Sequence, residues 1–280
     1  DLEKELQNKS IDIYSNLTRW QKVQLSRHPD RPHSIDYINE ITDYWFELHG
    51  DRNFSDDKAI ISGIGQIDHL KVAIIAQEKG KGTKEKLTRN FGMPRPEGYR
   101  KALRVMKLAE KFNFPIITLI DTPGAYPGVG AEERGQAEAI AKSIECCMEL
   151  KVPTIAIIIG EGGSGGAIAL ASSNKVLMLE NAIYSVISPE GCATILWRDP
   201  KKMLDAAEAM KLTANDLYEL KIIDGIIKEP LGGAHRDKDL TTENIKKELT
   251  IILDSFKQMS KDEIFNHRKS NYYRYKKEKK

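Results

Sequence analysis

The chain has 280 residues, 30% of them charged, and its 43 basic and 41 acidic residues nearly cancel to a formal net charge of +2. A balanced charge argues against a nucleic-acid-binding surface spread over the whole protein. No apolar run approaches the roughly 20 residues of a membrane span and no signal peptide opens the sequence, so we expect a soluble globular chain in a cytosol-like compartment.

The first part of the sequence predicts helices. Residues 1–27 are polar with apolar residues at helical spacing, and Pro29 and Pro32 then interrupt the pattern, which indicates an N-terminal helical arm. Ser34 can cap a second helix, with Gly50 as its stop signal. We interpret the apolar stripe of that helix as core packing rather than a partner site; it consists of Ile38, Ile41, Trp45 and Leu48.

Two β-strands, residues 59–67 and 71–77, are expected next, around a short turn. A glycine-broken loop with clustered lysines follows at residues 78–86. Two interpretations of this loop stay open, a solvated basic loop and a phosphate contact beside an anion-binding crevice. It lacks the G-x-x-x-x-G-K-[ST] pattern, so a Walker-type nucleotide site is not supported. A helix is predicted over residues 97–113.

Two consecutive units of strand, glycine-containing loop and helix come after it. In the first, the apolar run 115–121 leads into residues 122–130 and a helical stretch. In the second, the apolar run 152–159 leads into residues 160–167, where five of the seven positions 160–166 are glycine, and a helix begins near Gly165. Right-handed crossovers place the carboxyl ends of parallel strands at one edge of a sheet, so we expect both loops to face a single crevice.

The glycines of the second loop predict chemistry performed by the backbone itself. Glycine lacks the Cβ atom that would keep an anionic group away from N–H donors at a helix N-terminus. Such fixed donors stabilise the charge that develops on a carbonyl oxygen as it becomes an enolate. Two loops of this kind at one crevice would suit a reaction with two developing oxyanions.

A serine hydrolase is the competing interpretation. Ser164 stands in a G-x-S-x-G pattern, which is typical of a nucleophilic serine at a strand-to-helix turn. His235 with Asp224 or Asp205 has the required order along the chain, but His235 lies in a stretch rich in glycine and charge. The extra glycines at 163 and 165 are not needed for such a turn, so we favour backbone chemistry.

The last third of the chain predicts strands at residues 175–179 and 183–187, a turn at 188–192, helices at 200–210 and 214–220, and a helical tail from Asn244. We interpret the basic, tyrosine-containing residues 269–280 as a frayed, solvated terminus rather than a nucleic-acid site. The cysteines include no C-x-x-C pair, so we expect neither a disulfide framework nor a metal in this chain; they are Cys146, Cys147 and Cys192.

Seven stretches carry longer, specific motifs: residues 47–52 (ELHGDR), 89–93 (RNFGM), 96–102 (PEGYRKA), 121–136, 160–167 (GEGGSGGA), 184–192 (YSVISPEGC) and 229–235 (EPLGGAH). Together they resemble the alpha subunits of the carboxyltransferase of multisubunit, bacterial-type acetyl-coenzyme A carboxylase. The resemblance covers the chain from about Arg31 to the region of His267.

This resemblance implies a crotonase-like α/β fold, a β-β-α superhelix with an N-terminal helical arm. It implies an arm at residues 1–55, a carboxyltransferase domain at 56–258 and a basic C-terminal helix or tail at 259–280. The family assembles with a beta subunit as an α2β2 heterotetramer and is active only in that form; zinc belongs to the beta chain. Biotin carboxylase and the biotin carboxyl carrier protein are further expected partners, in the cytoplasm or, for a plastid-encoded chain, the stroma.

The implied reaction moves a carboxyl group from N1 of carboxybiotin, on its carrier protein, to the methyl carbon of acetyl-CoA, giving malonyl-CoA for fatty acid biosynthesis. Backbone donors at Gly162 and Gly163 would hold the ureido oxygen of biotin. The biotin pocket would be shaped by Gly124, Ala125, Gly165 and Gly166. Coenzyme A phosphates would be contacted by Lys79, Lys81 and Lys84. Two alternatives remain, a crotonase-superfamily hydrolase that uses Ser164 and a non-catalytic scaffold for the beta chain.

Overall fold

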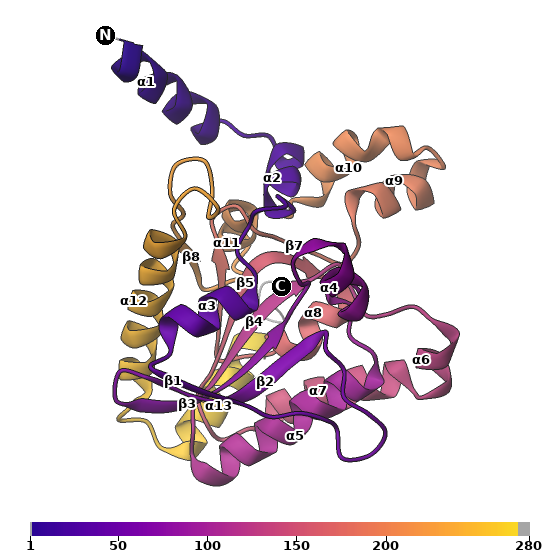
Figure 1. The fold of residues 1–280 in the computed structure, drawn as a ribbon, viewed down its shortest axis with the longest axis vertical. Coiled ribbons are helices and arrows are strands. Elements are labelled where there is room, and N and C mark those ends of the chain that lie inside the picture. The colour runs from indigo at the N-terminus through magenta and orange to yellow at the C-terminus, as the bar shows by residue number, and fades with distance from the viewer. Residues whose placement is uncertain (1, 274–280) are drawn as a thin grey trace.

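An eight-stranded sheet runs through residues 2–273, the part of the chain that the computed structural model describes (Figure 1). Its strand order is β1-β2-β3-β4-β5-β6-β8, and β7 pairs with β5 off this path. The first three strands pair antiparallel, and all later pairs are parallel. The strands are β1 (Tyr44–Glu47), β2 (Ile60–Ile67), β3 (Leu70–Gln77), β4 (Ile116–Thr122), β5 (Thr154–Gly163), β6 (Lys175–Leu179), β7 (Ile183–Ser185) and β8 (Gly225–Ile227).

Helices precede, connect and follow these strands. They are α1 (Leu2–Ser15), α2 (Arg19–Ser26), α3 (Ser34–Ile41), α4 (Gly82–Thr88), α5 (Pro96–Phe112), α6 (Val129–Glu133), α7 (Gln136–Glu149), α8 (Ser164–Ala171), α9 (Pro189–Trp197), α10 (Met203–Met210), α11 (Ala214–Glu219), α12 (Lys238–Phe256) and α13 (Lys261–Tyr273), with short 3-10 turns η1 (Asn90–Gly92) and η2 (Pro200–Lys202).

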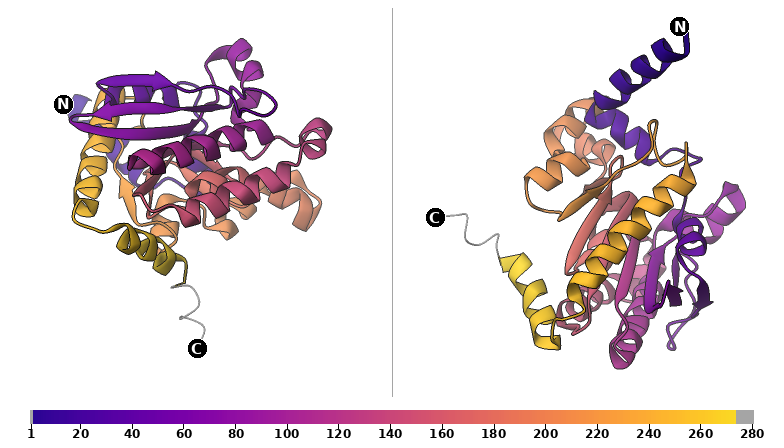
Figure 2. Two further views of the ribbon diagram at one scale, coloured as in Figure 1. Left: turned by 90° about the horizontal axis from the view of Figure 1, so that it is seen from below. Right: turned by 90° about the vertical axis from the view of Figure 1, so that its left-hand side faces the viewer.

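The central strands β4 and β5 are buried at every position. This is the pattern of a parallel sheet covered on both faces, and it explains why their sequences are continuously apolar before the glycines. Helices α5 and α7 pack side by side beneath the sheet in the left view of Figure 2. Helix α3 packs on β3 and β4, and α12 packs on α3 and β8.

The N-terminal segment has two different parts. Helix α1 projects from the body (Figure 1) and contributes no buried residue. Helix α2 begins with a capping box, in which the Thr18 side chain accepts from the Gln21 N–H and the Gln21 side chain accepts from the Thr18 N–H. It packs against α10, β5 and β7, so this part of the predicted helical arm belongs to the folded body.

The sequence predicted most of these elements correctly, including β2, β3, β4, β6, α5, α10 and α11. The predicted helix through Trp45 and Leu48 is wrong, because α3 ends at Ile41. Thr42 takes extended backbone angles, and the Asp43 N–H donates to the Gln66 carbonyl, which starts the pairing of β1 with β2. The lysine segment expected as a loop contains α4, and the turn expected at 188–192 is the start of α9.

The C-terminal helix α13 is tied down by one arginine. Arg268 is fully buried, and its guanidinium donates to the carbonyls of Leu150 and Val152 and to the Asn174 side chain. Residues 269–273, which the sequence predicted as part of a solvated tail, therefore belong to a helix that is anchored to the body through Arg268. Residues 274–280, the remainder of that prediction, lie outside the described residues.

Candidate active site

The two glycine segments meet at the carboxyl ends of β4 and β5, which are parallel neighbours. A Cβ atom built on Gly163 would lie 2.2 Å from the carbonyl oxygen of Pro123. One built on Gly166 would lie 2.6 Å from the carbonyl carbon of Gly124 and 2.7 Å from the nitrogen of Ala125. Only glycine permits this approach of backbone to backbone. The single crevice edge expected from parallel topology is therefore present.

Gly162 and Gly163 lie inside β5 rather than in a loop. The register pairs Gly162 with Thr122 of β4 on one side and with Tyr184 of β7 on the other, and it pairs Gly163 with Ser185. The strand is longer than its apolar run suggests because β7 extends the sheet beyond β6. The turn predicted over residues 160–167 is therefore strand up to Gly163 and helix from Ser164.

Helix α8 starts at Ser164 directly from the strand, with Gly163 as its N-cap. Ser164 has a φ of 53°, in the left-handed region, and its side chain is exposed. The backbone N–H groups of Gly165 and Gly166 lie in the first turn of α8, where an α-helix leaves its N–H groups without a partner inside the helix. The first turn of α8 therefore offers several donors, at the positive end of the helix dipole.

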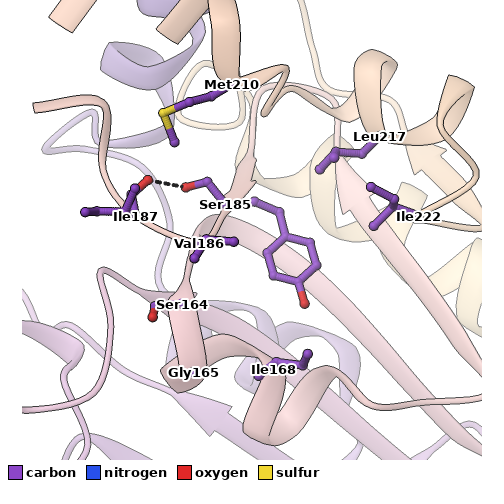
Figure 3. A pocket seen from close by; sticks show the side chains of 10 residues that line it. Ser164, Gly165, Ile168, Ser185, Val186, Ile187, Met210, Leu217 and Ile222 are labelled. Carbon is purple, nitrogen blue, oxygen red and sulfur yellow. Dashed lines mark hydrogen bonds between the residues drawn. The ribbon is translucent and has the colours of Figure 1, made fainter. Parts of the chain in front are cut away.

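A cavity of about 550 Å3 opens beside this helix start (Figure 3). Its walls come from α8, from β7 and the segment after it, and from α10, α11 and the segment after α11. Apolar side chains predominate, and the lining residues are Ser164, Gly165, Ile168, Tyr184, Ser185, Val186, Ile187, Met210, Leu217 and Ile222. The Ser185 hydroxyl donates to the Ile187 carbonyl at 2.8 Å, which holds the wall after β7. We call this cavity the α8 pocket.

Of the predicted pocket residues, Gly165 lines the α8 pocket directly. Gly124, Ala125 and Gly166 lie where the two backbone segments touch. Gly162 and Gly163 are buried in the strand that leads to the pocket. The structure therefore brings these residues into one region, with the strand glycines supporting the turn.

A buried ionic cluster lies next to this region. The Lys79 ammonium is 2.7 Å from Asp121 Oδ1 and 2.7 Å from Glu161 Oε2. Asp121 Oδ1 also accepts the Glu161 N–H at 2.9 Å, and a Cβ atom on Gly160 would lie 2.4 Å from the same oxygen. Gly160 thus permits the aspartate at the end of β4 to bind the backbone of β5.

The charges in this cluster decide its protonation. Burial alone would raise the pKa of Asp121, but the Lys79 ammonium and the His33 ring outweigh it and hold the pKa well below its usual range. Burial alone would lower the pKa of Lys79, but Asp121 and Glu161 outweigh it and raise the pKa. The pair is therefore ionised at neutral pH.

The three lysines predicted to contact phosphates differ in their surroundings. The Lys79 ammonium pairs with two carboxylates inside the ionic cluster, and its contact with coenzyme A phosphates stays a prediction. Lys81 is exposed and pairs with Asp36 at 2.6 Å. Lys84 is exposed on α4.

The groups of the hydrolase alternative are not assembled. No histidine lines the α8 pocket, and within residues 2–273 no hydrogen bond joins Ser164 to a histidine. The ring of His235 instead stacks on His28, with centroids 3.8 Å apart. Asp224 accepts the Val176 N–H beside Lys175. A serine nucleophile without a positioned base has no activation.

Sequence reasoning missed the side chains that surround the glycines. Arg27 Nε lies 2.6 Å from Glu161 Oε1, and Arg27 Nη1 lies 2.6 Å from Glu190 Oε1. A carboxylate in a buried strand requires a cationic partner, but the sequence placed position 161 in a loop, so this signal appears only with the extension of β5 to Gly163. Nothing in the sequence identifies Arg27 as that partner.

Over residues 2–273, no helix has the length and apolar character needed to cross a membrane. The same residues contain no group of three or more histidine, cysteine, aspartate or glutamate side chains arranged to hold a metal ion.

Comparison with known sequences gives a consistent result. A family model described as acetyl co-enzyme A carboxylase carboxyltransferase-like matches residues 1–276. The chain is 63% identical over 270 residues to the acetyl-coenzyme A carboxylase carboxyl transferase subunit alpha of Pelagibacter ubique, covering 96% of this chain and 73% of that protein. It is 57% identical over 263 residues to the protein of the same name from Campylobacter curvus, covering 94% of this chain and 85% of that one.

Solved structures show the same fold at low sequence identity. The transcarboxylase 12S chain superimposes with a TM-score of 0.67 at 17% identity, over 82% of this chain and 44% of that one. The beta subunit of P. aeruginosa geranyl-CoA carboxylase gives a TM-score of 0.63 at 16% identity, over 85% of this chain and 44% of that one. This chain thus spans less than half the length of either, and the predicted crotonase-like α/β fold is confirmed.

Proposed function

This chain belongs to the family of acetyl-coenzyme A carboxylase carboxyltransferase alpha subunits, and we propose on that basis that the α8 pocket is where it receives carboxybiotin. As a member of the family the chain is a carboxyltransferase subunit of a multisubunit enzyme. Its reaction transfers the carboxyl group of carboxybiotin to acetyl-CoA and forms malonyl-CoA for fatty acid biosynthesis.

In this reaction the N1–carboxyl bond of biotin breaks, the carboxyl carbon bonds to the acetyl methyl carbon, and the methyl proton passes to N1. What a protein adds is stabilisation of the negative charge that gathers on oxygen as these bonds change. The sequence assigned that stabilisation to Gly162 and Gly163. We propose that these two glycines fix the start of α8 through their strand pairing, and that the N–H groups of Gly165 and Gly166, in the first turn of that helix, face the ureido oxygen.

The pocket residues suit a small bicyclic ring with one polar edge. Ile168, Val186 and Ile187 offer apolar walls, while the donors of α8 lie at one side. Gly124 and Ala125 pack on Gly166 and would set the direction of that helix start. A carboxylated ring bound here would be oriented by fixed dipoles that need no rearrangement during the reaction.

Partners and boundaries complete the proposal. We propose that a beta chain, which also holds the zinc, supplies the acetyl-CoA half of the site in an α2β2 assembly, and that the biotin carboxyl carrier protein and biotin carboxylase act with it. Lys81 and Lys84 are the lysines whose exposure suits a phosphate contact. The arm at 1–55, the domain at 56–258 and the tail at 259–280 remain the proposed division, with the cytoplasm or the stroma as location.

The observation that carries this function is the contact of two glycine-containing backbone segments beside the N-terminus of α8 and an apolar pocket. Replacing Ser164 by alanine is expected to leave carboxyl transfer within about twofold of wild type, because the donors belong to the backbone. A hydrolase would lose about 10^3-fold or more. Rates of malonyl-CoA-dependent carboxylation of biocytin, and of ester hydrolysis, measured on the same Ser164→Ala preparation decide between the two functions. Loss of carboxyl transfer in that variant would refute the backbone assignment.

A further inference from the structure

Three residues at spacings of four, on helix α2 and at its C-cap, contact elements that surround the α8 pocket. Arg19, Val23 and Arg27 share one stripe of the helix, with Arg27 as its C-cap. Figure 1 shows α2 at the upper edge of the sheet, beside α10. Each of the three residues joins parts of the chain that are distant in sequence.

Arg27 links the strand that leads into α8 with the helix that follows the segment 186–187. Its Nε lies 2.6 Å from Glu161 of β5, three residues before Ser164. Its Nη1 lies 2.6 Å from Glu190 of α9, three residues after Ile187. One guanidinium thus holds the α8 side of the pocket and the wall after β7 at a fixed separation.

Arg19 links the other two walls. Its Nη1 lies 2.6 Å from Glu208 of α10, two residues before Met210. Its Nε and Nη2 bind both carboxylate oxygens of Asp216, at 2.9 and 2.5 Å, next to Leu217 of α11. Paired contacts of this kind fix orientation as well as distance, which a lysine cannot do.

Between the two arginines, Val23 is fully buried with Ile183 and Leu212, and Met210 packs on the same cluster. Met210 is itself a pocket residue. The apolar centre and the two ionic ends of α2 therefore act on the same cavity.

We propose that α2 is a strap that sets the width of the α8 pocket, and that Arg19 and Arg27 are positioning residues for carboxyl transfer. Four carboxylates on four elements meet these two arginines. Two of the elements, α10 and α11, contribute pocket residues, and the other two, β5 and α9, adjoin the lining segments at Ser164 and Ile187. The assignment to biotin rests on the proposed function. It gives the N-terminal segment a role in the reaction that the sequence alone did not suggest.

The KM for biocytin distinguishes a positioning role from a purely structural one. In the complex with the beta chain, Arg27→Met and Arg19→Met should each raise the KM for biocytin about tenfold, because the walls no longer hold the ring in place. The KM for malonyl-CoA should stay within about twofold, because the proposal assigns that substrate to the beta chain. A variant that only lost stability would lower kcat in proportion to the folded fraction and change neither KM.

A matched control exists in Arg100, whose side chain is 27% exposed, against 30% for Arg19 and Arg27. Arg100 pairs with Glu138 and donates to the Arg134 carbonyl, and neither partner lines the pocket. Arg100→Met should therefore leave both KM values unchanged. Arg27→Lys keeps the charge but cannot span both carboxylates in the same geometry, and it should resemble Arg27→Met.

Amide hydrogen exchange of the same proteins tests the strap without any reaction. The Arg19 and Arg27 variants should lose protection in residues 183–190 and 203–217, with unchanged protection in β4 and α5. If amide exchange in these two segments is the same in the variants and in the wild type, the proposal that α2 holds the pocket walls is wrong. Lost protection with an unchanged KM for biocytin would overturn its role in positioning. An inactive wild-type complex would instead refute the proposed function and the assignment to biotin, while the exchange data would still decide whether α2 holds the walls.

Discussion

Gly163→Val is expected to reduce carboxyl transfer at least about 100-fold, the loss typical of removing an oxyanion donor. A side chain at position 163 would meet the carbonyl oxygens of Pro123 and Thr122 at 2.2 and 2.9 Å. Both obstacles are backbone atoms, so no rotamer change relieves them. The two glycine segments would have to separate, which displaces the start of α8 from its place beside the pocket. The kcat for malonyl-CoA-dependent carboxylation of biocytin, measured with the beta chain, gives the effect.

The control for this experiment is Gly130→Ala. A Cβ atom at Gly130 would approach only the far end of the Arg134 side chain, at 3.2 Å, which can move away. Gly163→Ala presents the same backbone clash with a smaller group and serves if the valine variant does not fold. Wild-type kcat in a folded Gly163→Ala or Gly163→Val protein would show that the contact between the two segments is not needed for the reaction.

Lys79→Met is expected to have the largest effect on stability. The substitution leaves Asp121 and Glu161, 6% and 11% exposed, close together without their shared cation. Removing one partner of a buried pair costs about 3–5 kcal/mol, because the remaining charge keeps its desolvation penalty. For a chain of this size that corresponds to roughly 6–20 °C in Tm. Lys142→Met is the control, because Lys142 and its partner Glu145 are both more than half exposed. It should not change Tm measurably.

The pH dependence of this loss has a definite sign. In the wild type the pKa of Asp121 is depressed, so its stabilisation is complete above the unfolded value near 3.9 and is lost only as pH falls through the lower folded pKa. Without Lys79, only the His33 ring opposes the effect of burial, so the pKa of Asp121 rises and the variant binds a proton at a higher pH than the wild type does. The Tm difference between wild type and Lys79→Met should therefore be smaller at about pH 5 than at about pH 8. An equal difference at both values would contradict the role of Lys79 as the counter-cation.

Local patterns predicted the sheet because its central strands are continuous apolar runs bounded by turn residues. They failed where pairing partners far along the chain decide the structure. Trp45 matches a helical stripe, yet it lies in β1 because β2 offers an antiparallel partner. The sequence predicts Gly162 and Gly163 to lie in a loop, yet both belong to β5, because β7 pairs with the end of that strand. Strand pairing of this kind depends on residues that no local window contains.

The region of the site could be predicted from the two glycine motifs and parallel topology, but its walls could not. The donors after Gly163 follow from a strand that enters a helix without an intervening loop. The lysine at position 79 looked like a surface cation because nothing in its own segment shows that Asp121 and Glu161 bind it. Arg19 and Arg27 lie more than 130 residues from their carboxylate partners, so no spacing rule connects them.

The central claim is that this chain forms the biotin half of a divided carboxyltransferase site. Its most direct test is malonyl-CoA-dependent carboxylation of biocytin, measured with the purified chain alone and again with its cognate beta chain. Activity only in the mixture is the predicted result. Activity of the chain alone, or none in a verified complex, would contradict it.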